Sequence, residues 1–331
     1  MESVELGGTG VRVSRLALGC MIMGTRTPED EAFRILDRYL DLGGDFLDTA
    51  NCYAWWLRDG SRGGESEELL GRWFARGGTR DRVFLATKGS AMVTEPVFTA
   101  DGEPDWSAVR FEGAGADTLR RNLDGSLRRL GTDHVDLYYV HVDDASTPLE
   151  ETLGALAGLV EAGKTRYIGW SNVRTWRLER IRQLCARNGW PAPVALQQQH
   201  SYLRPRPAEA TPSIVTHEQL DYLRAHPDLT LVAYSPILKG LYDDLAKRNS
   251  GMMASYAGPD ADARLAEVDR VAAETGARPS QVVLAWLLAD RQPRIIPLIG
   301  PRTLDQFETA VPALDLTLTG EQLASLDAAG A

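Results

Sequence analysis

The sequence predicts an α/β fold, a closed (β/α)8 barrel of the TIM type, from two observations. Short apolar runs rich in Val, Ile and Leu alternate with stretches of helical leucine spacing, and eight such units fit in 331 residues. This alternation implies parallel strands joined by helical crossovers, and strands buried on both faces suit a closed barrel. An open doubly wound sheet would need a glycine-rich phosphate turn after an early strand. Because Gly7, Gly8 and Gly10 precede the first repeating strand, we favour the barrel.

The expected strands are short, and most are bounded by Gly, Pro or charged residues. They cover residues 15–19, 45–48, 83–87, 135–141, 167–171, 194–197, 230–234 and 294–297. Between them, leucines recur at helical spacing, as at Leu119, Leu123 and Leu127. Before the first strand, the glycine-rich turn predicts a small hairpin that pairs residues 4–6 with residues 11–13. We expect residues 1–331 to form a single barrel domain.

Three connections are longer than ordinary loops, at residues 89–115, 200–216 and 236–262. Each follows an expected strand, so all three would lie at the C-terminal mouth of the barrel. Long loops on a compact domain are usually functional. We therefore expect these loops to form substrate walls or a belt over a cofactor.

Charge, cysteine content and hydropathy exclude several classes of protein and of binding partner. The formal net charge of −10 argues against nucleic acid and anionic membrane as main partners. Cys20, Cys52 and Cys185 are far apart and form no C-x-x-C motif, which indicates reduced thiols and neither a disulfide framework nor a metal site. No apolar stretch approaches membrane-spanning length, and residues 1–10 lack signal-peptide features. These features predict a cytoplasmic protein that acts on a small molecule.

Polar side chains end three consecutive expected strands. Asp48 ends the second strand, Lys88 follows the third, and His141 ends the fourth, while Tyr53 lies shortly after Asp48. Active sites of such barrels lie at the C-terminal ends of the strands. We therefore expect these four side chains to meet at one mouth.

This set of residue types suits the reduction of a carbonyl group. Hydride addition to C=O creates an alkoxide, which needs a proton donor and a positive field. Tyr53 would be the acid, with its pKa lowered from about 10 by the Lys88 ammonium. Asp48 would hold Lys88, and His141 would orient the carbonyl. Each residue alone also has a structural explanation, as a turn cap, a wall residue, a solvated strand end or a loop histidine, so their combination carries the prediction.

The same segments resemble the aldo-keto reductase family. Residues 46–53, FLDTANCY, are similar to the family's signature around its Asp and Tyr; residues 86–88 and 137–141 are similar to those around its Lys and His. Further similar stretches lie at residues 64–71, 168–172, 233–236 and 296–302. The resemblance implies a barrel closed at the bottom by the N-terminal hairpin. It also implies metal-free, NAD(P)H-dependent reduction of aldehydes and ketones, with Asp48, Tyr53, Lys88 and His141 as the catalytic group.

The resemblance further implies a set of cofactor contacts. Ser171, Asn172 and Gln197 would bind the nicotinamide carboxamide, and Tyr234, followed by Ser235, would stack on its ring. The loop that begins at Gly300 would cover the adenosine phosphate. The expected contacts there are Arg302, whose guanidinium matches a 2′-phosphate, and Gln306, which stands where many members place an Arg. We therefore favour NADPH over NADH.

Residues beside Tyr53 depart from the family's pattern. Ala54 replaces a common Gly, and Trp55, Trp56 and a polar insertion at residues 58–63 follow it. Aromatic faces suit sugar rings and aromatic ligands. The tryptophan pair thus favours a cyclic carbonyl substrate such as a ketosugar or an aromatic aldehyde, although either Trp could instead pack against a helix.

Two other functions compete with this prediction. Some proteins similar to this family are cofactor-sensing regulatory subunits of membrane channels, and they can retain the catalytic residues. A barrel hydrolase or isomerase could use Asp48 and His141, but a metal-dependent barrel needs several converging ligands, and only one of the five histidines ends an expected strand. Carbonyl reduction explains more of the residues than either alternative.

Overall fold

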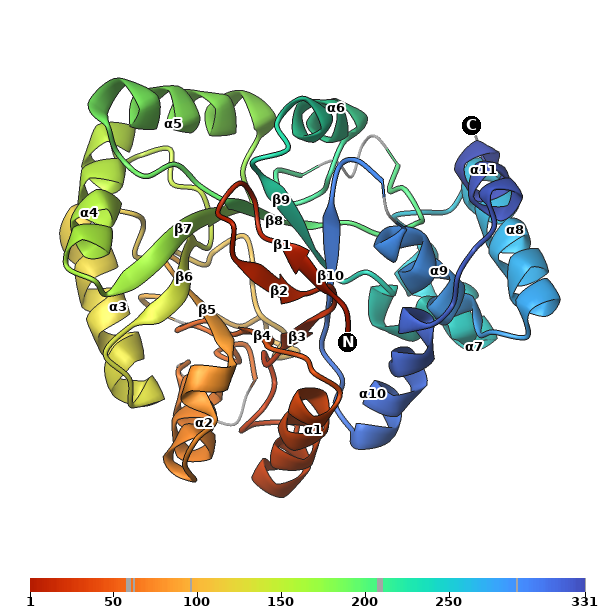
Figure 1. Ribbon diagram of the computed structural model, residues 1–331, viewed down its shortest axis with the longest axis horizontal. Coiled ribbons are helices and arrows are strands. Elements are labelled where there is room, and N and C mark those ends of the chain that lie inside the picture. The colour runs from red at the N-terminus through yellow and green to blue at the C-terminus, as the bar shows by residue number, and fades with distance from the viewer. Residues whose placement is uncertain (58–60, 62, 96, 207–210, 290, 331) are drawn as a thin grey trace.

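A closed ring of eight parallel strands forms the centre of the molecule (Figure 1). The computed structural model describes residues 1–57, 61, 63–95, 97–206, 211–289 and 291–330. The strands of the ring are β3 (Ala17–Gly19), β4 (Phe46–Asp48), β5 (Phe84–Gly89), β6 (Val135–Val140), β7 (Thr165–Ser171), β8 (Ala195–Gln199), β9 (Thr230–Tyr234) and β10 (Ile295–Ile299). They follow chain order around the ring, and β10 closes it against β3. The predicted barrel is confirmed, and every expected strand overlaps an observed one.

Helices surround the ring and supply the crossovers between its strands (Figure 1). They are α1 (Glu29–Asp41), α2 (Glu65–Ala75), α3 (Ala116–Leu130), α4 (Leu149–Glu161), α5 (Thr175–Asn188), α6 (His217–Ala225), α7 (Leu245–Arg248), α8 (Pro259–Thr275), α9 (Pro279–Leu288), α10 (Leu304–Ala310) and α11 (Gly320–Ala328), with short 3-10 turns η1 (Arg80–Arg82), η3 (Leu238–Asp243), η4 (Gly251–Met253) and η5 (Val311–Leu314). Among the described helices, none has both the length and the apolar character that crossing a membrane requires.

Alternate side chains along each strand face opposite sides of the barrel wall. Leu47 and Leu85 join the large apolar cluster between strands and helices, whereas their neighbours Phe46 and Ala86 join the cluster inside the barrel. Since side chains alternate along a strand, Asp48 shares the inner face with Phe46. The same alternation places Lys88 on the inner face of β5.

The N-terminal hairpin covers the bottom of the barrel. Strands β1 (Ser3–Glu5) and β2 (Arg12–Ser14) pair antiparallel with Val4 opposite Val13, so the predicted hairpin and its register are confirmed, with the bounds of each strand one residue further from the turn. Leu6 and Val13 pack into the inner cluster. The Gly7 amide donates to the hydroxyl of Thr230, the first residue of β9, at 2.7 Å. The hairpin therefore closes the end of the barrel where the strands begin.

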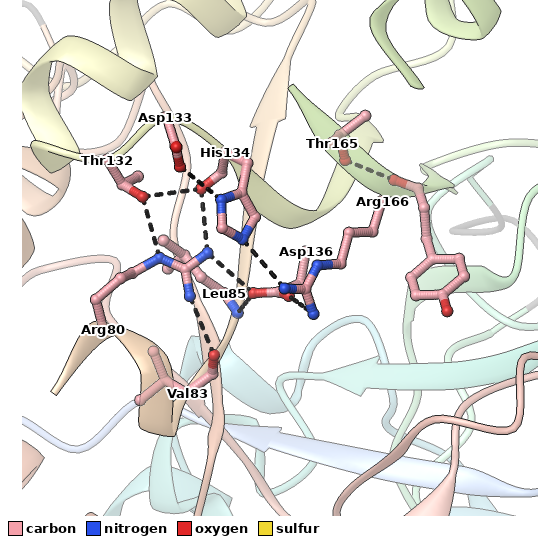
Figure 2. Close-up of polar contacts among 10 residues, drawn as sticks. Arg80, Val83, Leu85, Thr132, Asp133, His134, Asp136, Thr165 and Arg166 are labelled. Atoms are coloured by element: carbon pink, nitrogen blue, oxygen red, sulfur yellow. Dashed lines mark hydrogen bonds and ion pairs between the residues drawn. The ribbon is translucent and has the colours of Figure 1, made fainter. Parts of the chain in front are cut away.

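A buried ion pair joins three strands near the same end (Figure 2). Asp136, the second residue of β6, is only 3% exposed. Its carboxylate accepts from Arg80 and Arg166, each at 3.1 Å, and from the Leu85 amide of β5 at 2.9 Å. Arg80 also donates to the carbonyl of His134 at 3.1 Å. Since buried charges need complete hydrogen bonding, this network favours one register for β5, β6 and β7.

The long connections lie at the opposite end, after β5, β8 and β9. Residues 89–115 contain two isolated β-bridges, Val93 with Phe111 and Phe98 with Pro104. The connection after β9 contains η3, α7 and η4, and α8 already begins at Pro259, so it is more ordered than a plain loop. The expected long connections at the C-terminal ends of these strands are confirmed, with residues 207–210 of the second lying outside the described part.

Candidate active site

The buried ammonium of Lys88 has three partners at the mouth of the barrel. It donates to the Asp48 carboxylate, to the Thr49 carbonyl at 2.8 Å and to the Tyr53 hydroxyl at 2.7 Å. Lys88 and Asp48 are both fully buried. An ammonium has three N–H donors, so each one is satisfied here. A buried charge held by three partners has little freedom, which fixes Tyr53 relative to Asp48.

The strand register explains why residues so far apart in sequence meet. Asp48 of β4 pairs with Ala86 of β5, and Lys88 pairs with Tyr139 of β6. Side chains two residues apart share a face, so Lys88 faces inward with Ala86, and His141 follows Tyr139. The acid, the lysine and the histidine therefore end neighbouring strands on the inner side of the barrel, as predicted.

Tyr53 lies in the turn after β4 and is 8% exposed. Burial, followed by the Asp48 carboxylate, raises the pKa of its phenol well above 10. The expected lowering of this pKa by Lys88 is wrong, because burial of the phenol, together with the nearby Asp48 carboxylate, outweighs the ammonium. Tyr53 therefore keeps its proton at neutral pH, and it is the protonated form that can act as an acid.

His141 lies edge-on to the ring of Tyr53, with 5.6 Å between ring centroids. Burial, followed by the Lys88 charge, lowers the pKa of the imidazole well below 6.5. The Nδ1 atom lies 3.4 Å from the Cys52 sulfur, and the backbone carbonyl of His141 accepts from Asn172 at 2.7 Å. At neutral pH the ring is uncharged, with a single N–H to donate.

Gln197 of β8 reaches Asp48 from across the barrel. Its amide nitrogen donates to the second carboxylate oxygen of Asp48 at 2.8 Å. The sequence assigned Gln197 only to the cofactor, so this contact with the catalytic group was missed. The amide oxygen of Gln197 remains for a ligand.

Ser171, Asn172 and Tyr234 form a connected rim on β7 and β9. The Asn172 amide donates to the Ser171 hydroxyl at 3.0 Å, and the Tyr234 hydroxyl donates to the Asn172 oxygen at 3.0 Å. Asn172 and Ser235 both have left-handed backbones, with φ of 54° and 53°. Such conformations in residues other than glycine cluster at functional sites.

The loop after β10 carries the residues predicted for the adenosine end. Gly300 is exposed, and the Arg302 amide donates to the Gln306 side chain at 2.9 Å. Thr27 donates to the Arg302 carbonyl at 3.2 Å. Gln306 therefore shapes the loop through the backbone, while the exposed Arg302 guanidinium forms no hydrogen bond or ion pair with the described residues.

Aromatic side chains form one wall beside Tyr53. Trp56 contacts Tyr53 edge-on, with 6.4 Å between centroids, and Trp55 lies beneath it, 2% exposed. Trp106, from residues 89–115, packs on Trp55 at 5.1 Å and is 61% exposed. Ala54 has φ of 74°, a conformation that favours glycine, which explains the common Gly at this position. Of the polar insertion, residues 58–60 and 62 lie outside the described part.

The sequence model of the aldo/keto reductase family matches residues 15–331. The chain belongs to the aldo/keto reductase family.

Similar sequences and a similar solved structure agree with this assignment. The uncharacterised oxidoreductase YrpG of Bacillus subtilis (strain 168) is 37% identical, over 99% of this chain and 95% of its own. Norsolorinic acid reductase stcV of Emericella nidulans is 31% identical, over 96% of this chain and 78% of its own. The crystal structure of the thermostable aldo-keto reductase Tm1743 with the inhibitor epalrestat has a TM-score of 0.71 at 27% identity and covers 99% of both chains. This aldo-keto reductase is therefore an NAD(P)H-dependent oxidoreductase.

Two residues at the site of this aldo-keto reductase were missed by sequence reasoning. Trp106 lies far along the chain from Trp55, and only the path of residues 89–115 brings the two rings together. Cys52 was considered only as a reduced thiol. Its place directly before Tyr53 was a signal of proximity, but not of its contact with His141.

Proposed function

We propose that this aldo-keto reductase reduces the carbonyl group of a cyclic substrate with NADPH, and that Tyr53 is the general acid. The observation that carries the proposal is the 2.7 Å contact between the buried Lys88 ammonium and the Tyr53 hydroxyl. It joins a proton donor to a fixed positive charge at the mouth of a barrel. That pairing is what a reacting carbonyl oxygen needs.

The donor set at the mouth fits a nicotinamide cofactor. Ser171 accepts from Asn172, so its own hydroxyl proton remains available for a carboxamide. Gln197 keeps its amide oxygen, and the Tyr234 hydroxyl is bonded to the side chain of Asn172. On the loop after β10, the Arg302 guanidinium matches the geometry of a 2′-phosphate, which supports NADPH over NADH.

When bound, the reduced nicotinamide supplies a hydride to the carbonyl carbon. His141, uncharged at neutral pH, donates its single N–H to the carbonyl oxygen and orients it. Tyr53 gives its proton to the same oxygen as negative charge develops there. The phenolate left behind is stabilised by the Lys88 ammonium, which contacts its oxygen directly. Asp48 keeps the ammonium in place throughout.

The aromatic wall indicates a flat or cyclic substrate. Trp56 lies against Tyr53, and the exposed Trp106 extends the same wall from the loop after β5. Aromatic surfaces bind rings through offset and edge contacts, each contributing about 0.5–1.5 kcal/mol beyond burial. Ketosugars and aromatic aldehydes present such ring faces, whereas short linear carbonyls do not.

A carbonyl panel followed by cofactor absorbance tests the proposal. NADPH and NADH are compared on aromatic aldehydes, ketosugars and linear carbonyls. We expect turnover that is faster with NADPH and faster with ring substrates, and Trp56→Ala and Trp106→Ala variants that lose the preference for rings. Trp176→Ala, at an exposed tryptophan on α5, is the matched control.

Two results would overturn parts of this proposal. If Trp56→Ala and Trp106→Ala both keep the original ratio of rates on cyclic and linear carbonyls, the proposal of a cyclic substrate is excluded. Negligible turnover across the whole panel, with tight NADPH binding, would favour a cofactor-sensing regulatory subunit.

A further inference from the structure

Cys52 presents a buried thiol to the catalytic histidine. Its side chain is 3% exposed, and its sulfur lies 3.4 Å from Nδ1 of His141, within hydrogen-bond reach for sulfur. Burial raises the pKa of this thiol to about 12. At neutral pH it is therefore an S–H group, a weak donor and a weak acceptor. The carbonyl-reduction chemistry described above gives Cys52 no part.

The direction of the Cys52–His141 hydrogen bond decides which nitrogen of the ring carries the proton. An uncharged imidazole has one N–H and one bare nitrogen. If Nδ1 carried the proton, Nε2 would present a lone pair, which repels a carbonyl oxygen. If Cys52 donates to Nδ1, the proton lies on Nε2, the nitrogen left for the substrate. The hydrogen bond made by one ring nitrogen sets the state of the other.

We propose that Cys52 is a positioning residue, which donates its S–H to Nδ1 of His141 and thereby keeps the proton on Nε2, aimed at the substrate oxygen. This inference rests on the proposed function, because it assigns His141 the role of a neutral donor. It adds a residue outside the catalytic group of Asp48, Tyr53, Lys88 and His141.

Three contacts hold this donor and acceptor in place. The amide of Asn172 fixes the His141 backbone through the 2.7 Å bond to its carbonyl. Cys52 is held by its neighbour in the chain, since the hydroxyl of Tyr53 accepts a hydrogen bond from Lys88. The ring of His141 lies edge-on to Tyr53, so a rotation that broke the contact with Cys52 would also disturb that packing.

The nitrogen-15 chemical shifts of the histidine rings at neutral pH test the proposal, because protonated and bare ring nitrogens are well separated. The signal of His141 is assigned by its loss in His141→Asn. In the unsubstituted protein we expect the proton on Nε2 alone. In Cys52→Val, which keeps the approximate shape and removes the donor, we expect both tautomers, and in Cys52→Ser we expect Nε2 again.

Steady-state kinetics should follow the tautomer. Since a net hydrogen bond corresponds to a factor of a few, we expect kcat to fall about 3- to 10-fold in Cys52→Val with little change in KM, and to recover in Cys52→Ser. Cys185→Val, another buried cysteine far from the site, is the matched control and should keep the original kcat.

Three results would overturn the inference: His141 protonated on Nδ1 in the unsubstituted protein, an unchanged tautomer in Cys52→Val, or a kcat for Cys52→Val equal to that of Cys185→Val. The ring shifts are measured without substrate, so they report on Cys52 whether or not carbonyl reduction holds. Failure of the proposed function would appear separately, as full turnover in Tyr53→Phe.

Discussion

Gln197 donates to Asp48 across the full width of the barrel, with 2.8 Å between the amide nitrogen and the carboxylate. Their strands, β8 and β4, are four places apart in a ring of eight and so lie opposite one another. Asp48 thus has Lys88 on one oxygen and Gln197 on the other. The carboxylate that holds the ammonium is itself held by a strand on the far side.

Loss of the Gln197 amide should therefore weaken both the fold and the catalytic group. In Gln197→Leu, a buried carboxylate loses a donor, and we expect the free energy of unfolding to fall by about 1–3 kcal/mol. We also expect kcat to fall, because Lys88 is less firmly held. Chemical denaturation and steady-state assays measure the two effects. Gln199→Leu, which breaks a bond to Tyr256 instead, should leave kcat close to its original value.

Arg302 should set the preference between the two nicotinamide cofactors. A charged hydrogen bond to a 2′-phosphate contributes about 1.5–3 kcal/mol, so Arg302→Ala should raise the KM for NADPH about 10- to 100-fold. The KM for NADH, which lacks this phosphate, should stay the same and serves as the internal control. Equal changes for both cofactors would place the 2′-phosphate elsewhere.

The sequence predicted the fold and the meeting of four polar side chains at its mouth, because both follow from local patterns. Short apolar runs identified the strands, and polar residues at three strand ends identified Asp48, Lys88 and His141. The contact of Gln197 with Asp48 could not be found in this way, since it depends on closure of the ring. The pKa of Tyr53 was predicted in the wrong direction, because burial and the pairing of Lys88 with Asp48 are properties of the packed site.

The ion pair at the bottom of the barrel should affect stability and not activity (Figure 2). Asp136 is the second residue of β6, at the end of the strand away from His141. Asp136→Asn leaves Arg80 and Arg166 without their buried carboxylate, and we expect a loss of about 3–5 kcal/mol in the free energy of unfolding. The kcat measured well below the unfolding temperature should be unchanged. Asp133→Asn is the control, since its side chain is 95% exposed and should change stability by no more than about 0.5 kcal/mol.

Stability should decline as the pH falls below 6.5. Burial, followed by the charges of Arg291 and Arg204, lowers the pKa of His200 to about 4, and burial likewise lowers that of His141. The unfolded chain therefore binds these protons first, and the free energy of unfolding decreases between pH 6.5 and about 4. For the partly exposed His200 we expect a loss of about 2 kcal/mol over this window. Denaturation midpoints across the range measure it, and a slope that is the same in His200→Gln would exclude His200 as its source.

Single-turnover hydride transfer in Tyr53→Phe tests the central claim most directly. This change removes the phenol oxygen that Lys88 holds at 2.7 Å and leaves the aromatic ring. With NADPH bound and a carbonyl substrate that the unsubstituted enzyme reduces, we expect the rate to fall by about 10²- to 10⁴-fold while the Kd for NADPH is unchanged. A rate within a few-fold of the original would contradict the assignment of Tyr53 as the acid.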